Sequence, residues 1–148
     1  MHHIFYLEGN KRKISWAIKT NDTIVNQNRI HAEMYKDKVT DIQSKYIALH
    51  VGLFWGIGVF IIKNEDSIKI KLDDETMYDH FTSNSKIKDE LIQKRMQFIR
   101  QLQKQRKLKI EFESIEKDMN LARNTKNKKI NEKVKRALNQ NYQNNSYD

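Results

Sequence analysis

The sequence predicts an α/β domain with a five-stranded mixed sheet and elements in the order β-β-β-α-β-α-β-α. Apolar runs separated by short polar turns open the chain. Two later segments carry apolar residues at helical spacing, and two more alternate apolar and polar residues as strands do. With 148 residues, the chain has the length of a single compact domain.

The N-terminal strands are expected to form an antiparallel meander. Residues 3–8 and 12–19 have the apolar character of strands, and the polar residues 9–11 between them predict a turn. Residues 21–22 are a second turn signal, after which residues 23–33 have the pattern of a third strand.

A helix is predicted to begin near Thr40 or Asp41, since either side chain suits an N-cap. Its apolar stripe consists of Ile42, Tyr46, Leu49 and Leu53. Residues 46–62 lack formal charge and include two glycines four positions apart, a spacing also found where membrane helices pack. The stretch is shorter than the roughly 20 apolar residues of a membrane span, so it predicts a buried helix followed by a buried turn.

The remaining elements alternate along the chain. They are a strand over 67–72, a helix over 86–106, a strand over 108–112 and a helix over 116–138. We expect residues 1–125 to form the folded domain and residues 126–148 to form a basic helical extension with a polar tail.

The composition favours a polyanionic partner. The formal net charge is +9, from 28 Lys and Arg against 19 Asp and Glu. Cysteine is absent, which excludes disulfides and thiolate metal sites. No secretory leader is evident, so an intracellular location is expected, and no membrane partner is expected.

Basic residues gather near both ends of the chain and at a further cluster of Lys104, Arg106, Lys107 and Lys109, and such groups suit phosphate contacts. The candidates are Lys11, Arg12 and Lys13 on the first hairpin and Lys126, Lys128, Lys129, Lys133, Lys135 and Arg136 near the C-terminus. Such contacts give salt-dependent affinity without base specificity. A solvated helix face with no partner has the same pattern, so the clusters alone do not decide.

Carboxylates follow the strand at 67–72. Ile68, Ile70 and Leu72 alternate with lysines, and the strand leads directly into Asp73 and Asp74. Strand ends that present carboxylates are typical of divalent-metal sites in phosphate-cleaving enzymes.

Several motifs together resemble the ribonuclease H family. FYLEGN is similar to its first strand, and TDIQSKYIALHVGL to its first helix. LDDETM is similar to the segment that carries its third acidic residue, and KDMNLAR to its closing helix. The resemblance covers about residues 3–125 and implies a ribonuclease H-like fold. It also implies a site where four carboxylates, Asp-Glu-Asp-Asp, hold two metal ions, Mg²⁺ or Mn²⁺.

The acidic set departs from the family pattern. Glu8 stands in the first position and Asp73 in the third, with Asp74 as a register alternative. Lys45 stands where the second carboxylate is expected, and its ammonium would repel a divalent ion and could pair with Glu8 or Asp73. Three registers are open for the fourth position, which would be Asp118, Arg123 or Asn124.

Three functions are open. The favoured interpretation is a nucleic-acid-binding protein whose nuclease site is impaired, with RNA, an RNA–DNA hybrid or a duplex as partner. The alternative is an active, metal-dependent ribonuclease H that uses Glu8, Asp73 and Asp118, with Glu8 and Asp73 as metal ligands. A third is a protein–protein adaptor or a structural subunit of a ribonucleoprotein assembly. The scattered histidines and the lack of a glycine-rich phosphate loop offer no competing chemistry.

Overall fold

The computed structural model describes residues 1–83 and 86–123. Its strands are β1 (His2–Gly9), β2 (Lys13–Thr20), β3 (Thr23–Ile30), β4 (Ser67–Leu72) and β5 (Lys109–Ser114). Its helices are α1 (Asp41–Gly58), α2 (Glu75–Thr82), α3 (Glu90–Arg106) and the short 3₁₀ helix η1 (Lys117–Met119).

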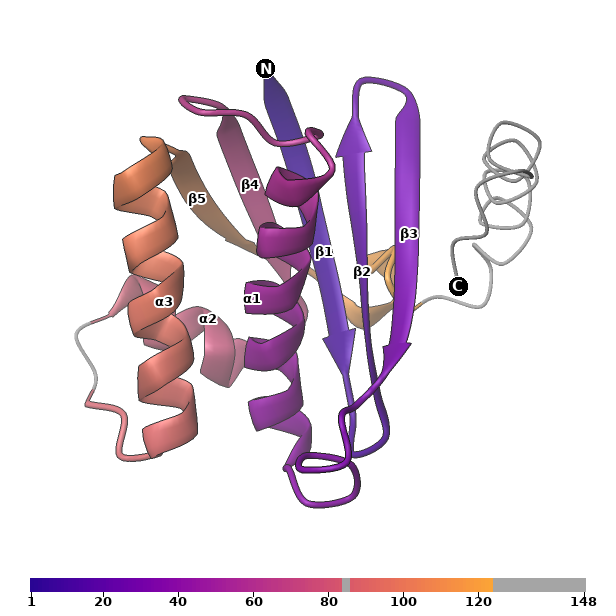
Figure 1. Ribbon diagram of the computed structural model, residues 1–148, viewed down its shortest axis with the longest axis vertical. Coiled ribbons are helices and arrows are strands. Elements are labelled where there is room, and N and C mark those ends of the chain that lie inside the picture. Colours follow the sequence, from indigo (N-terminus) through magenta and orange to yellow (C-terminus); the bar gives the residue numbers. More distant parts are fainter. Residues whose placement is uncertain (84–85, 124–148) are drawn as a thin grey trace.

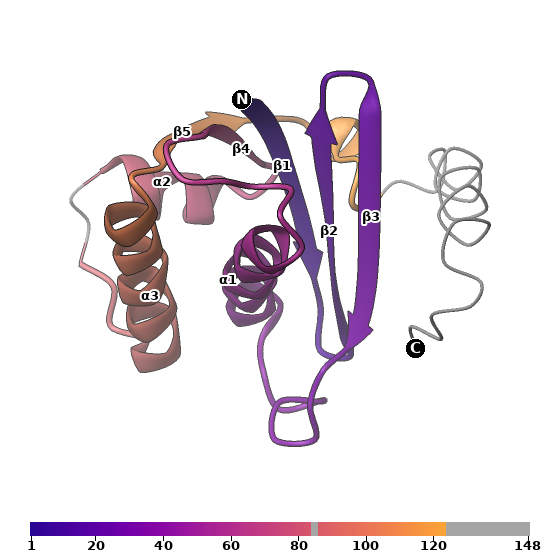
Figure 2. The same ribbon diagram turned by 45° about the horizontal axis from the view of Figure 1, so that its top comes forward.

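The strands form a mixed sheet in the order β3-β2-β1-β4-β5, which confirms the predicted fold class. The first three strands are antiparallel neighbours, as the turn signals predicted. β4 is parallel to β1, and β5 is parallel to β4. Figures 1 and 2 show α1 against one face of this sheet, with α3 alongside α1.

The third strand ends earlier than predicted. Ile30 pairs with Lys13, which is the first residue of β2, so the chain beyond Ile30 has no neighbouring strand with which to pair. The chain then turns, and the side chain of the buried His31 lies 2.7 Å from the Ser44 hydroxyl on α1. The prediction of a strand through residue 33 was therefore wrong at its end.

Capping side chains set the helix boundaries. Thr40 caps α1 and forms a reciprocal capping box with Gln43, as the sequence predicted. α3 begins at Glu90 and not at residue 86, because the Asp89 side chain accepts a hydrogen bond from the Ile92 N–H. α2 was not predicted, and Asp74 caps it in the same way.

The closing segment corrects a further prediction. A helix was expected from residue 116, but residues 117–119 form a single 3₁₀ turn and residues 121–123 form a turn. The Asn120 side chain accepts a hydrogen bond from the Ala122 N–H at 2.9 Å, which stabilises a turn at the expense of helix. Residues 124–138 of the expected helix, and the extension over 126–148, lie outside the described residues.

Two glycines allow α1 to lie close to the sheet. A Cβ on Gly52 would come within 2.5 Å of the Phe5 ring and 2.8 Å of the Trp16 ring, and one on Gly56 would come within 2.8 Å of Ile62. The four-residue spacing of Gly52 and Gly56 thus allows α1 to pack closely within this domain. Within the described residues, no helix is long and apolar enough to cross a membrane.

The predicted turn after α1 is buried only in part. Ile62 is 2% exposed and belongs to the core, whereas Phe60 is 78% exposed. Phe60 has a φ of 65°, so the backbone reverses sharply there and carries this side chain away from the core.

We expect Gly52→Ala to lower the free energy of unfolding by about 1–3 kcal/mol, because the added methyl group overpacks the contact with Phe5 and Trp16. Gly58→Ala is the matched control, since a Cβ there meets nothing within 4 Å. It should be neutral or stabilising by up to about 1 kcal/mol. Urea unfolding followed by circular dichroism measures both, and equal effects would contradict the packing account.

Candidate functional site

The sheet brings Glu8 and Asp73 together. β1 and β4 are parallel neighbours, and Tyr6 lies opposite Lys71. Glu8 follows Tyr6 by two residues and Asp73 follows Lys71 by two, so the two carboxylates are at the same level of the sheet. Phe5 packs towards α1, so by alternation the Glu8 side chain projects from the opposite face of β1. The Asp73 side chain is 3% exposed and that of Glu8 is 20% exposed. Two of the predicted acidic residues therefore lie at one place.

A guanidinium group lies between these two carboxylates. Arg123 Nε is 3.2 Å from Glu8 Oε2, and Arg123 Nη1 is 3.4 Å from Asp73 Oδ2. Glu8 also accepts a hydrogen bond from the Gly9 N–H at 2.8 Å through its other oxygen. Arg123 was one of the three residues considered for the fourth acidic position. It brings a positive charge between Glu8 and Asp73.

Asn120 joins the same cluster and was not singled out from the sequence. Its side chain is fully buried, and Nδ2 donates to Asp73 Oδ2 at 2.9 Å and to the Leu7 carbonyl at 2.8 Å. A second anchor is the Ser15 hydroxyl, which donates to the Ala122 carbonyl at 2.9 Å. These bonds fix the closing segment against β1 and β2 and thereby place Arg123.

Lys45 does not contact either of the two predicted partners. Its Nζ lies 3.1 Å from Asp74 Oδ2, so the expected pairing with Glu8 or Asp73 was wrong. The reason is that α2 turns the Asp74 side chain back toward α1, where its other oxygen accepts from the Met77 N–H at 3.0 Å. Asp74 is thus a helix cap and an ion-pair partner.

The electrostatics of Asp74 follow from these contacts. Partial burial alone would raise its pKa. Hydrogen bonds from the Met77 N–H and from Lys45, together with the charge of Lys45, outweigh burial and leave the pKa of Asp74 below its ordinary value. The folded state therefore favours the ionised carboxylate.

The cluster does not fit a pair of divalent ions. Metal ions of this kind need several converging carboxylate oxygens. Here Asp73 is met by an amide N–H of Asn120 and a guanidinium of Arg123, and Lys45 lies on the adjoining helix. Asp118, a candidate for the fourth acidic position, is exposed on η1. Among residues 1–83 and 86–123, no group of three or more acidic or histidine side chains could hold a metal ion.

The basic hairpin forms a second feature. Lys11, Arg12 and Lys13 are exposed at the β1–β2 turn, where Asn10 Oδ1 accepts from the N–H groups of Arg12 and Lys13. These cations line a hollow of about 660 Å³, which Asp37 and Asp41 also line. The remaining predicted nucleic-acid-binding residues, from Lys126 to Arg136, lie outside the described residues.

Comparisons with solved structures identify the fold. The chain superposes on a ribonuclease H1 from the archaeon Halobacterium salinarum with a TM-score of 0.60 and 15% identity, covering 79% of this chain and 87% of that one. The N-terminal ribonuclease H domain of a Mycobacterium tuberculosis protein gives a TM-score of 0.63 at 14% identity, with coverages of 93% and 98%.

A third similar structure is a ribonuclease H1 isolated from compost by a metagenomic approach, solved in complex with an RNA/DNA hybrid. Its TM-score is 0.64 at 17% identity, covering 92% of this chain and 99% of that one. No protein-family model and no curated protein matches the sequence. The fold is therefore ribonuclease H-like. At these sequence identities the similarity establishes the fold and nothing about activity.

We expect Asp74→Asn to destabilise the protein at pH 7 by no more than about 1 kcal/mol, since solvent partly screens the pair with Lys45. Asparagine caps a helix as well as aspartate does, so the substitution isolates the charge. Because the pKa of Asp74 is depressed on folding, its contribution is present above its ordinary value of 3.8 and is lost as pH falls through the folded-state value.

The free energies of unfolding of the parent and Asp74→Asn should therefore converge in strong acid. Urea titrations between pH 2 and pH 7 measure this. A difference that persists unchanged at the lowest pH would contradict a charge effect and indicate lost packing.

Proposed function

We propose that this protein binds nucleic acid through its ribonuclease H-like fold and does not cleave it. One observation carries the proposal: the Arg123 guanidinium bridges Glu8 and Asp73, the two carboxylates that would have to hold metal ions. A guanidinium keeps its charge at any physiological pH, so a change of pH does not free the carboxylates.

Neighbouring groups support the same proposal. Arg123 and the Asn120 amide both contact Asp73 Oδ2, so a divalent ion could bind that oxygen only by displacing them, and Asn120 is itself fixed to the Leu7 carbonyl. Lys45 adds a second cation beside the strand ends. Cations and amide donors suit a phosphate group, whereas a bound metal ion requires anionic oxygens.

The partner is inferred from charge and from the similar structures. A net charge of +9 favours a polyanion. The compost ribonuclease H1 is described in complex with an RNA/DNA hybrid, and a duplex of that kind is the first ligand to test. The competing function is cleavage of such a hybrid, for which Glu8 and Asp73 do lie together.

We expect the full chain to bind a labelled hybrid with an affinity that falls steeply as salt is added, because the contacts are with phosphates. Fluorescence anisotropy at several salt concentrations measures this. Truncation after Asn124 should weaken binding and flatten the salt dependence, since it removes the basic residues from Lys126 to Arg136. Unchanged binding by the truncated chain would assign the interface to the domain itself.

The same hybrid, incubated with Mg²⁺ or Mn²⁺, should remain uncut. Asp73→Asn is the control, because it keeps the shape of the side chain and removes its charge. Cleavage by the parent that Asp73→Asn abolishes would establish the enzyme and overturn the proposal.

Replacing Lys45, Asn120 and Arg123, the three residues that bring cations or an amide donor to the strand ends, should create a metal site. The variant Lys45→Glu/Asn120→Asp/Arg123→Ala removes two cations and places four carboxylates near the strand ends, so we expect it to bind Mn²⁺ at least tenfold more tightly than the parent. Isothermal titration calorimetry measures this, with circular dichroism as the check on folding. Lys45→Glu alone should give a smaller gain, because Arg123 still bridges Glu8 and Asp73. Equal Mn²⁺ affinity of parent and triple variant would contradict the view that Lys45, Asn120 and Arg123 keep divalent ions from Glu8 and Asp73.

A further inference from the structure

Two exposed aromatic side chains lie on the outer surface that α1 and α3 form together, which we call the α1–α3 face. Phe54 on α1 is 63% exposed, and Phe98 on α3 is 47% exposed. Figures 1 and 2 show the two helices side by side as the outermost layer on this side of the sheet. Phenylalanine is among the residues most often buried in folded proteins, so two exposed rings on one surface indicate an interaction site.

Contacts between the helices bring the two rings into adjoining turns. The His50 ring stacks on the Phe98 ring, with centroids 5.2 Å apart and planes 9° from parallel. Phe54 follows His50 by about one helical turn, so it lies on the same side of α1. Arg95 on α3 donates to His50 Nδ1 at 2.9 Å and holds the imidazole in this arrangement. The aromatic surface therefore extends across both helices.

The α1–α3 face carries little net charge, although the net charge of the chain is +9. Helical spacing places five exposed side chains in one stripe along α3, and they are Glu90, Lys94, Phe98, Gln101 and Gln105. The one acid and the one base in this stripe balance each other. His50 adds no charge at neutral pH, because burial and the neighbouring charge of Arg95 lower its pKa to about 4.

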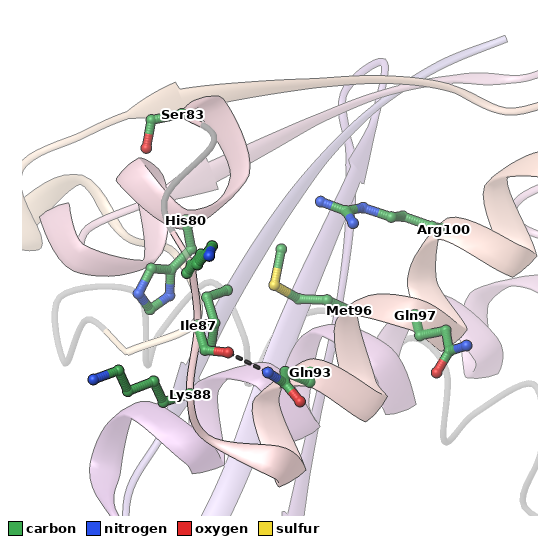
Figure 3. Close-up of a pocket in the computed structure, with 9 residues that line it drawn as sticks. His80, Ser83, Ile87, Lys88, Gln93, Met96, Gln97 and Arg100 are labelled. Carbon is green, nitrogen blue, oxygen red and sulfur yellow. Dashed lines mark hydrogen bonds between the residues drawn. The ribbon is translucent and has the colours of Figure 1, made fainter.

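Much of the positive charge of α3 lies away from this stripe. Figure 3 shows the Arg100 side chain extending from α3 toward the side where His80 of α2 lies. Lys104 follows Arg100 by about one turn, so it lies on that side as well. Arg95 is half-buried and is engaged with His50. The exposed stripe of α3 is thus a neutral surface on a basic protein.

We propose that the α1–α3 face binds the same face of a second copy of this chain and forms a two-fold symmetric homodimer. A second copy brings the matching surface, since rings meet rings and the amides of Gln101 and Gln105 both donate and accept hydrogen bonds. A strongly basic face would repel its own copy, whereas a neutral one does not. The same neutrality gives an acidic protein or a nucleic acid little to pair with. The inference does not depend on the proposed function, because Glu8 projects from the opposite face of the sheet.

Sedimentation velocity of the full chain, freed of nucleic acid by nuclease treatment and a high-salt wash, tests the proposal. We expect the mass to rise from 17.8 kDa toward twice that value as the protein concentration increases, with a dissociation constant in the micromolar range. Phe54→Gln/Phe98→Gln should weaken the dimer at least about tenfold, because both rings are lost from the interface. A monomer at every concentration up to millimolar would overturn the proposal and leave a different protein, or residues 124–148 of the chain itself, as the occupant.

Ile30→Ser is the control. It removes an apolar side chain that is 72% exposed from β3, at the edge of the sheet opposite to β5 and away from α3 (Figure 1). It should leave the dissociation constant within about twofold of the parent. Equal losses in this variant and in Phe54→Gln/Phe98→Gln would indicate nonspecific apolar association and would overturn the proposal.

Charged variants test the symmetry of the dimer. Gln101→Glu/Gln105→Glu and Gln101→Lys/Gln105→Lys each bring like charges into both halves of the interface, so each variant alone should be monomeric where the parent is dimeric. An equimolar mixture of the two should restore the dimer, because opposite charges then meet. Circular dichroism checks that each variant is folded. A mixture that stays monomeric would contradict pairing of this face with its own copy.

Discussion

The parallel pairing of β1 with β4 brings two carboxylates together, and the segment after η1 supplies the positive charge that they need. Register and alternation place Glu8 and Asp73 on the same face, and Asp73 is almost completely buried. Two carboxylates cannot share a desolvated place without a positive partner. Arg123 supplies that partner, so the strand pairing, the closing segment and the electrostatics of the site depend on one another.

The hydrogen bonds of Asn120 hold Asp73 and the segment that carries Arg123 in one arrangement. It is fully buried, and its amide satisfies a strand carbonyl and the Asp73 carboxylate at once, while its carbonyl oxygen turns the chain toward Arg123. A buried amide with every hydrogen bond satisfied fixes one arrangement, because any other would leave a polar group without a partner. The same turn stops helix formation at the point where the sequence predicted it to continue.

Close packing on the other face explains why α1 keeps its position. Gly52 permits contact with Phe5 and Trp16, and Gly9 lies so close to Ser44 that a Cβ there would come within 2.5 Å of its hydroxyl. Helix and sheet are therefore held at backbone distance. Lys45, one residue after Ser44, is consequently held near the strand ends, where it meets Asp74.

The sequence by itself determined the elements whose signals are local. Alternation and periodicity predicted all five strands, α1 and most of α3, and they correctly placed Glu8 and Asp73 at strand ends. The resemblance located Lys45 at a position where an acid was expected. Local signals suffice for these features because each depends on neighbours within a turn or a strand.

Tertiary structure decided which side chains meet. Arg123 lies 50 residues from Asp73 along the chain, and Asn120 lies 113 residues from Leu7. No periodicity encodes such contacts, and the sequence left three registers open for the fourth position. α2 was missed for a different reason, since its cap is local: Asp74 was weighed only as a metal ligand, although its bond to Met77 spans three residues. The sequence shows which side chains are charged, whereas only the folded structure shows which of them form pairs.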